Sequence, residues 1–142
     1  MKHYKKGYTQ GVYDMFHIGH LNLLRGAKEY CDELVVGVNA NALVQSYKSK
    51  TPVVDEKNRR EIVANIKAVD NALIVETLDK VELLKEIGFD AIFIGDDWRG
   101  SERWTKTEQV LAEYGVDVVY LPYTKGVSST QLRPEYNNAV QD

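Results

Sequence analysis

Residues 8–20 read YTQGVYDMFHIGH, and within this stretch a strand pattern passes into a helix pattern. The first part, residues 8–12, is rich in aromatic and β-branched residues, which favour a strand. The last part holds His17, Gly19 and His20 and begins a helix pattern that runs to residue 30. A strand that turns directly into a helix is typical of α/β proteins built on a parallel sheet.

The alternation of strand and helix patterns continues along the chain. Further strand patterns cover residues 34–39, 72–75, 91–94 and 116–121, and several are unbroken apolar runs that suit strands buried on both faces. The helix patterns cover residues 19–30, 55–69, 78–87 and 105–114. Residues 45–54 are predicted to form a loop. This order predicts one α/β domain over residues 1–142, with a five-stranded parallel sheet flanked by helices.

Composition narrows the possible functions. The net charge of −3, from 18 basic and 21 acidic residues, argues against a general binder of nucleic acids or anionic membranes. The single cysteine, Cys31, excludes an internal disulfide framework. No apolar run approaches the roughly 18 residues that span a bilayer, and no secretory signal follows the first residues. A cytoplasmic protein without membrane insertion is therefore expected.

His17 and His20 lie where a helix is expected to begin, and residues three apart share one helix face. A helix N-terminus offers N–H groups and partial positive charge to an anion, and Gly19 lets a phosphate approach the backbone. The alternative is that one histidine caps the helix and the other packs in the core. A zinc site is a weaker alternative, because Asp14 is the only nearby third ligand. The placement of both histidines at this junction favours a phosphate site.

Two other strand ends carry polar residues. Residues 126–130, GVSST, open a final helix pattern, and their hydroxyls either cap the helix or bind an anion. Residues 95–98, GDDW, carry two carboxylates, for which there are three alternative roles: to bind Mg²⁺, to contact a ribose or to cap the turn. Ligands of open parallel sheets bind beyond the carboxyl ends of the strands. These residues are therefore expected near His17 and His20.

Basic residues supply further candidates. Arg59 shares the apolar stripe of helix 55–69, so it should be paired or face a buried anion, whereas Arg60 should face solvent. Lys48 and Lys50 lie in the predicted loop, where they are either solvated or add charge beside a phosphate-binding face.

The motifs at residues 13–20, 95–100 and 126–130 resemble those of the nucleotidyltransferase superfamily with the His-x-Gly-His signature. Within it, the chain looks most like the bacterial glycerol-3-phosphate cytidylyltransferases, over about residues 7–133. The resemblance implies a Rossmann-like fold, a homodimer, and Mg²⁺ held mainly by nucleotide phosphates without direct protein ligands. The implied reaction joins CTP and sn-glycerol 3-phosphate into CDP-glycerol, with release of pyrophosphate, for teichoic acid or capsule synthesis.

The resemblance also implies roles for individual residues. The implied catalytic residues are His17, His20, Lys50 and Arg59, and those that bind the acceptor phosphate are Lys48, Lys80 and Arg59. The implied nucleotide-binding residues are Val12, Tyr13, Asp14, His17, Gly19, His20, Lys50, Gly95, Asp97, Tyr123, Thr124, Gly126, Val127, Ser128, Ser129 and Thr130. Tyr123 stands where the family has a phosphate-binding arginine, which bears on the identity of the acceptor.

Three alternatives stay open at this point. The first is a cytidylyl- or adenylyltransferase that acts on another small phosphate, such as phosphocholine, phosphoethanolamine or a sugar phosphate. The second is a flavodoxin-like module that binds nucleotides without catalysis, and the third is a zinc hydrolase that uses both histidines.

Overall fold

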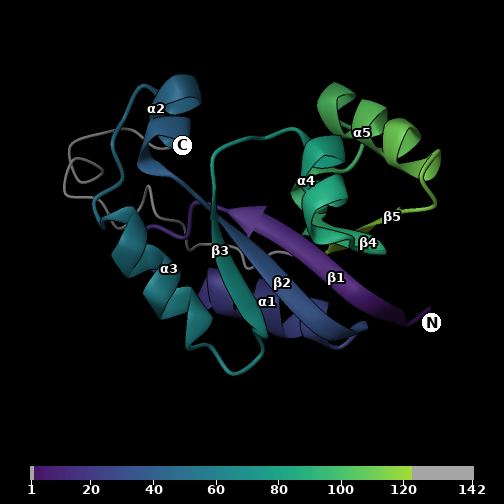
Figure 1. Cartoon of the computed structure of the whole chain (residues 1–142), viewed down its shortest axis with the longest axis horizontal. Helices are drawn as coiled ribbons and strands as arrows, with labels where there is room; N and C mark the ends of the chain where they lie inside the picture. The colour runs from purple at the N-terminus through teal and green to yellow at the C-terminus, as the bar shows by residue number, and fades with distance from the viewer. Residues whose placement is uncertain (1, 123–142) are drawn as a thin grey trace.

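The computed structural model describes residues 2–122, and its five strands form one parallel sheet (Figure 1). The strands are β1 (Tyr4–Gly11), β2 (Cys31–Asn39), β3 (Asn71–Val75), β4 (Ala91–Gly95) and β5 (Asp117–Leu121). Their order across the sheet is β3-β2-β1-β4-β5, so the chain winds outward from β1 to β3 and then crosses back to β4. The predicted Rossmann-like sheet is confirmed, and its topological switch point lies between β1 and β4.

Helices cover both faces of the sheet (Figure 1). They are α1 (Ile18–Lys28), α2 (Asn41–Lys48), α3 (Glu56–Ala64), α4 (Lys80–Ile87) and α5 (Glu102–Ala112). Leu24 of α1 and Val63 of α3 belong to the apolar core on one face, and Leu83 of α4 and Leu111 of α5 belong to the core on the other. Within residues 2–122, no helix is long and apolar enough to cross a bilayer.

The predicted loop at 45–54 is wrong in its first part, because α2 continues to Lys48. This helix has eight residues and buries only Val44. With only one buried residue, the segment shows no helical spacing of apolar residues, so its sequence does not mark it as a helix. The helix matters for function because it directly follows the carboxyl end of β2, where ligands of such sheets bind.

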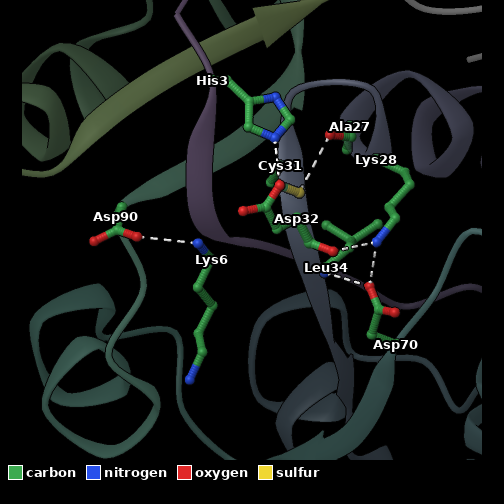
Figure 2. A network of polar contacts seen from close by, with 9 residues as sticks. All are labelled: His3, Lys6, Ala27, Lys28, Cys31, Asp32, Leu34, Asp70 and Asp90. Carbon is green, nitrogen blue, oxygen red and sulfur yellow. Dashed lines mark hydrogen bonds and ion pairs between the residues drawn. The ribbon is translucent and has the colours of Figure 1, made fainter.

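Asp70 ties three elements together at the opposite, amino-terminal edge of the sheet (Figure 2). Its carboxylate lies 2.7 Å from Lys28 Nζ of α1 and accepts a hydrogen bond of 2.7 Å from the backbone N–H of Leu34 in β2. Burial disfavours the charge, but the bonds from Lys28 and Leu34 outweigh it and lower the pKa of Asp70. The nearby pair of His3 and Asp32 is more exposed.

Replacing Asp70 with alanine is expected to lower the free energy of unfolding by about 1–2 kcal/mol, because the Leu34 N–H loses its acceptor and Lys28 loses its ion pair. Asp32→Ala is the matched control, since an exposed ion pair contributes roughly 0–1 kcal/mol. Urea unfolding followed by circular dichroism measures both variants. Equal losses in the two variants would contradict the role given to Asp70.

Candidate active site

An open cavity of about 600 Å³ lies at the carboxyl ends of β1, β2 and β4. Residues of α1 and α2 and the starts of α4 and α5 also line it. It therefore occupies the switch point at which open parallel sheets bind their ligands. His17, Gly19 and His20 line one wall, as the sequence predicted.

His17 and His20 are locked in position by the first turn of α1. His17 is the N-cap residue, and its Nδ1 accepts a hydrogen bond of 3.1 Å from the N–H of Gly19. His20 Nδ1 accepts a bond of 3.2 Å from the N–H of His17. A backbone N–H only donates, so Nδ1 of each neutral ring is unprotonated and the proton sits on Nε2. One capping arrangement thus makes both imidazoles Nε2–H donors.

The two imidazole rings stack, with centroids 3.8 Å apart and an interplanar angle of 20°. Burial, together with repulsion from His17, lowers the pKa of His20 to about 4, and burial also lowers the pKa of His17. The edge of Tyr13 packs against the His20 ring at 5.4 Å between centroids. At neutral pH the cavity wall therefore presents two neutral, fixed donors, which suits charge that develops on a phosphate.

The β1–α1 connection holds strained backbone. Tyr13 and Met15 have φ of 54° and 50°, in the left-handed region that non-glycine residues rarely occupy. Between them Asp14 is buried, and its carboxylate accepts hydrogen bonds of 2.9 Å from the backbone N–H groups of Val53 and Val54. Tyr13 and Asp14 thus lie behind the cavity wall, where they support the histidines and the 53–54 segment. Val12 lines the cavity itself.

Arg59 is fully buried and bonds to protein oxygens. Its Nε donates to the carbonyl of Val54 at 2.8 Å, and Nη1 donates to those of Val12 at 2.7 Å and Asn39 at 2.8 Å. Nη2 donates to Oδ1 of Asn41 at 2.6 Å. Through these hydrogen bonds Arg59 connects the ends of β1 and β2 to the start of α2.

The other basic candidates divide into two groups. Lys48 and Lys80 line the cavity, and Arg103 joins them there, whereas Lys50 is exposed and lies outside the lining. Burial, and then repulsion from Arg103, lowers the pKa of Lys80 to about 8. Lys80 Nζ donates to the carbonyl of Leu78 at 2.9 Å and lies 5.8 Å from the ring centroid of Trp104.

The GDDW segment also reaches the cavity. Gly95, Asp97 and Trp98 line it, the last two from a short 3₁₀ turn, η1 (Asp96–Trp98). The remaining predicted nucleotide-binding residues lie outside the described part of the chain: Tyr123, Thr124, Gly126, Val127, Ser128, Ser129 and Thr130.

Sequence reasoning missed several polar and aromatic residues that line the cavity: Gln10, Asn39, Tyr47, Arg103 and Trp104. One signal was available for Asn39, which is the last residue of β2 and so sits at a carboxyl strand end. Arg60, expected to face solvent, donates from Nε to the carbonyl of Ala72 at 3.0 Å. Among residues 2–122, no three His, Cys, Asp or Glu side chains are placed to hold a metal ion.

A sheet of this order, with a His-x-Gly-His helix start at its switch point, defines the class of Rossmann-like nucleotidyltransferases. Within that class the chain belongs to the cytidylyltransferase-like family, whose profile matches residues 8–135. The family membership confirms the predicted superfamily.

Individual curated relatives are similar over most of this chain. The chain is 38% identical over 127 residues to the bifunctional protein HldE of Bradyrhizobium diazoefficiens, covering 89% of this chain and 25% of that protein. The HldE of Caulobacter sp. (strain K31) is 36% identical over 129 residues, covering 90% and 26% respectively. The chain thus spans about a quarter of the length of these curated relatives.

Solved structures share the fold. The lipopolysaccharide core biosynthesis protein from Thermoplasma volcanium has a TM-score of 0.72 and 27% identity, covering 87% of this chain and 99% of that one. Pantothenate synthetase from Thermus thermophilus has a TM-score of 0.67 and 16% identity, covering 94% and 64%, and shows the fold alone.

Proposed function

We propose that this protein transfers a nucleotidyl group from a nucleoside triphosphate to the phosphate of a small sugar or polyol phosphate. The observation that carries the proposal is the pair of fixed Nε2–H donors of His17 and His20, two residues that line a cavity whose lining also includes three cations. Such a cavity is complementary to two phosphate-bearing substrates held side by side. CTP is the proposed donor on the strength of the family, with ATP as the alternative.

The acceptor is proposed to carry its negative charge on the phosphate alone and to have an uncharged, hydroxyl-rich body. The described residues that line the cavity include three cations, Lys48, Lys80 and Arg103, and a single carboxylate, Asp97. This balance disfavours the cationic groups of phosphocholine and phosphoethanolamine. The relation to a protein named for lipopolysaccharide core biosynthesis favours a sugar phosphate over glycerol 3-phosphate, the acceptor first expected.

In the proposed reaction, an oxygen of the acceptor phosphate attacks the α-phosphorus of the triphosphate. A new P–O bond forms, the bond from the α-phosphorus to the bridging oxygen breaks, and pyrophosphate leaves with the electron pair. A phosphate monoester has its second pKa at about 6, so it is already an anion near pH 7 and needs no general base. Catalysis is then placement and stabilisation of charge.

Each wall of the cavity has a part in this reaction. His17 and His20 donate from Nε2 to phosphate oxygens on which charge increases, and the N-terminus of α1 adds its partial positive charge. Lys48 and Lys80 hold and orient the phosphates from the other walls. Arg59 fixes the strand ends beneath them.

Mg²⁺ belongs to the proposal as an ion carried by the nucleotide. Asp97 is the cavity's one carboxylate within residues 2–122, which fits a metal bound mainly by phosphate oxygens and water. When bound, the ion would neutralise charge on the β- and γ-phosphates. The homodimer implied by the family resemblance likewise remains a prediction.

The test is release of pyrophosphate with Mg²⁺, with CTP and ATP each crossed against sugar phosphates, glycerol 3-phosphate, ribitol 5-phosphate and phosphocholine. Turnover with CTP and a sugar or polyol phosphate is expected, and turnover with phosphocholine alone would contradict the acceptor assignment. Absence of nucleotide binding in a titration would overturn the proposed function.

A further inference from the structure

A chain of hydrogen bonds runs from the core to the cavity and begins at Tyr8, which is fully buried in β1. Burial raises the pKa of Tyr8, so its hydroxyl stays protonated. That hydroxyl donates to Oε1 of Gln10 at 2.8 Å. Gln10 Nε2 lies 3.1 Å from the carbonyl of Thr77, which only accepts, so the nitrogen must face Thr77 and the oxygen Tyr8. The orientation of the Gln10 amide is therefore fixed.

The fixed Gln10 amide determines the next two links. Its Nε2 also donates to Oδ1 of Asn39 at 2.8 Å, so the other end of the Asn39 amide is a donor. Asn39 Nδ2 lies 3.1 Å from the hydroxyl oxygen of Tyr47 and donates to it. Because Tyr47 accepts from Asn39, its own O–H proton points away from the chain. Three buried or half-buried residues thus make Tyr47 a donor.

Tyr47 lies at the cavity wall. It is in the last turn of α2, directly before Lys48, and both residues line the cavity together with Gln10 and Asn39. The Tyr47 side chain is exposed, with 40% of its surface accessible. An oriented O–H in a lining that also includes the Lys48 ammonium group is complementary to an anionic oxygen.

We propose that the Tyr47 hydroxyl, oriented by the Tyr8–Gln10–Asn39 chain, donates a hydrogen bond to the phosphate of the acceptor and selects for it together with Lys48. The proposal rests on the proposed function and names the acceptor side of the cavity. Tyr47 and Lys48 follow β2, whereas His17 and His20 follow β1. In this proposal the triphosphate binds on the side of His17, His20 and the N-terminus of α1.

Tyr47→Phe removes the donor and leaves the ring. A hydrogen bond to a charged group contributes roughly 1.5–3 kcal/mol, so the KM for the acceptor should rise about 10- to 100-fold, while the KM for the nucleoside triphosphate stays within about twofold. An unchanged acceptor KM, or an equal rise in both KM values, would overturn the proposal.

Asn39→Asp tests the orientation of the chain. A carboxylate has the shape of the amide but only accepts, so Tyr47 would donate to residue 39, and its proton would no longer point into the cavity. The acceptor KM should rise as in Tyr47→Phe, and the double variant should show no further rise. Additive effects would contradict the relay. A thermal melt shows whether Asn39→Asp folds. If it does not, the KM values of Tyr47→Phe alone test the proposal.

A binding measurement separates this proposal from the proposed function. With inorganic phosphate as the probe and no nucleotide, the wild-type protein should broaden the ³¹P resonance more than Tyr47→Phe does. If the wild type turns over no substrate pair but shows this difference, the proposed function fails and the role of Tyr47 in phosphate binding stands. If turnover occurs and Tyr47→Phe changes neither the acceptor KM nor the broadening, Tyr47 is not a phosphate donor.

Discussion

His20→Ala is expected to lower kcat about 100- to 1,000-fold, the usual loss when one pre-organised donor to a transition state is removed. The reason is geometric: the N–H of His17 bonds to His20 Nδ1 and the two rings stack, so before any substrate binds the His20 proton is fixed on Nε2 of a residue that lines the cavity. The measurement is release of pyrophosphate at saturating substrates, with the acceptor found in the substrate panel.

Alanine at position 20 also removes a helix cap, so a second variant separates the two effects. His20→Glu keeps a side-chain acceptor at the third position of the helix, where glutamate completes a capping box, but it removes the N–H donor. It should therefore melt close to the wild type and still lose most of its activity. His3→Ala, at the far edge of the sheet, is the matched histidine control and should keep wild-type turnover. Near wild-type turnover in both His20 variants would remove His20 from the mechanism.

The fold was predictable because its signals are local. Several of the strands are apolar runs, and the glycines Gly88 and Gly115 take positive φ at or just after the ends of α4 and α5. The helix α2 was not predicted, because it buries a single residue and so shows no apolar stripe. The ends of the elements shifted by a few residues, since caps such as Asp55 and Ser101 depend on side-chain bonds that periodicity does not show.

The candidate site was predictable only where its residues are close in sequence. His17, Gly19 and His20 form one short motif at one helix start, so their placement follows from the chain itself. Gln10, Asn39 and Tyr47 come together only when β1 and β2 pair and α2 folds back over their ends. No spacing in the sequence marks three such uncharged residues as a connected set.

Arg59 was correctly predicted to be buried, but burial alone does not say whether its guanidinium binds a phosphate or oxygens of the protein. The apolar stripe predicted that the guanidinium would be buried against oxygens, and the family resemblance made those the oxygens of a phosphate. In the structure they belong to the protein, at Val12, Asn39, Asn41 and Val54. A cation with this many protein partners is expected to act on the proposed reaction by positioning the strand ends.

Arg59→Lys is expected to lower the free energy of unfolding by about 3 kcal/mol, because lysine lacks the planar fork that reaches oxygens on several sides. Turnover should fall through kcat, since the carbonyls of Val12 and Asn39 lose their common donor at the cavity floor. Arg60→Lys is the matched control: Arg60 makes one bond of 3.0 Å to a carbonyl and is partly exposed, so its loss should stay below about 1.5 kcal/mol.

Urea unfolding and steady-state kinetics on the same preparations distinguish the two roles of Arg59. A positioning residue predicts a large loss of stability with similar proportional changes for both substrates. A residue that contacts the acceptor phosphate predicts the reverse: stability close to the wild type and a selective rise in the acceptor KM. The second result would return Arg59 to the acceptor site and require its protein partners to release it when substrate binds.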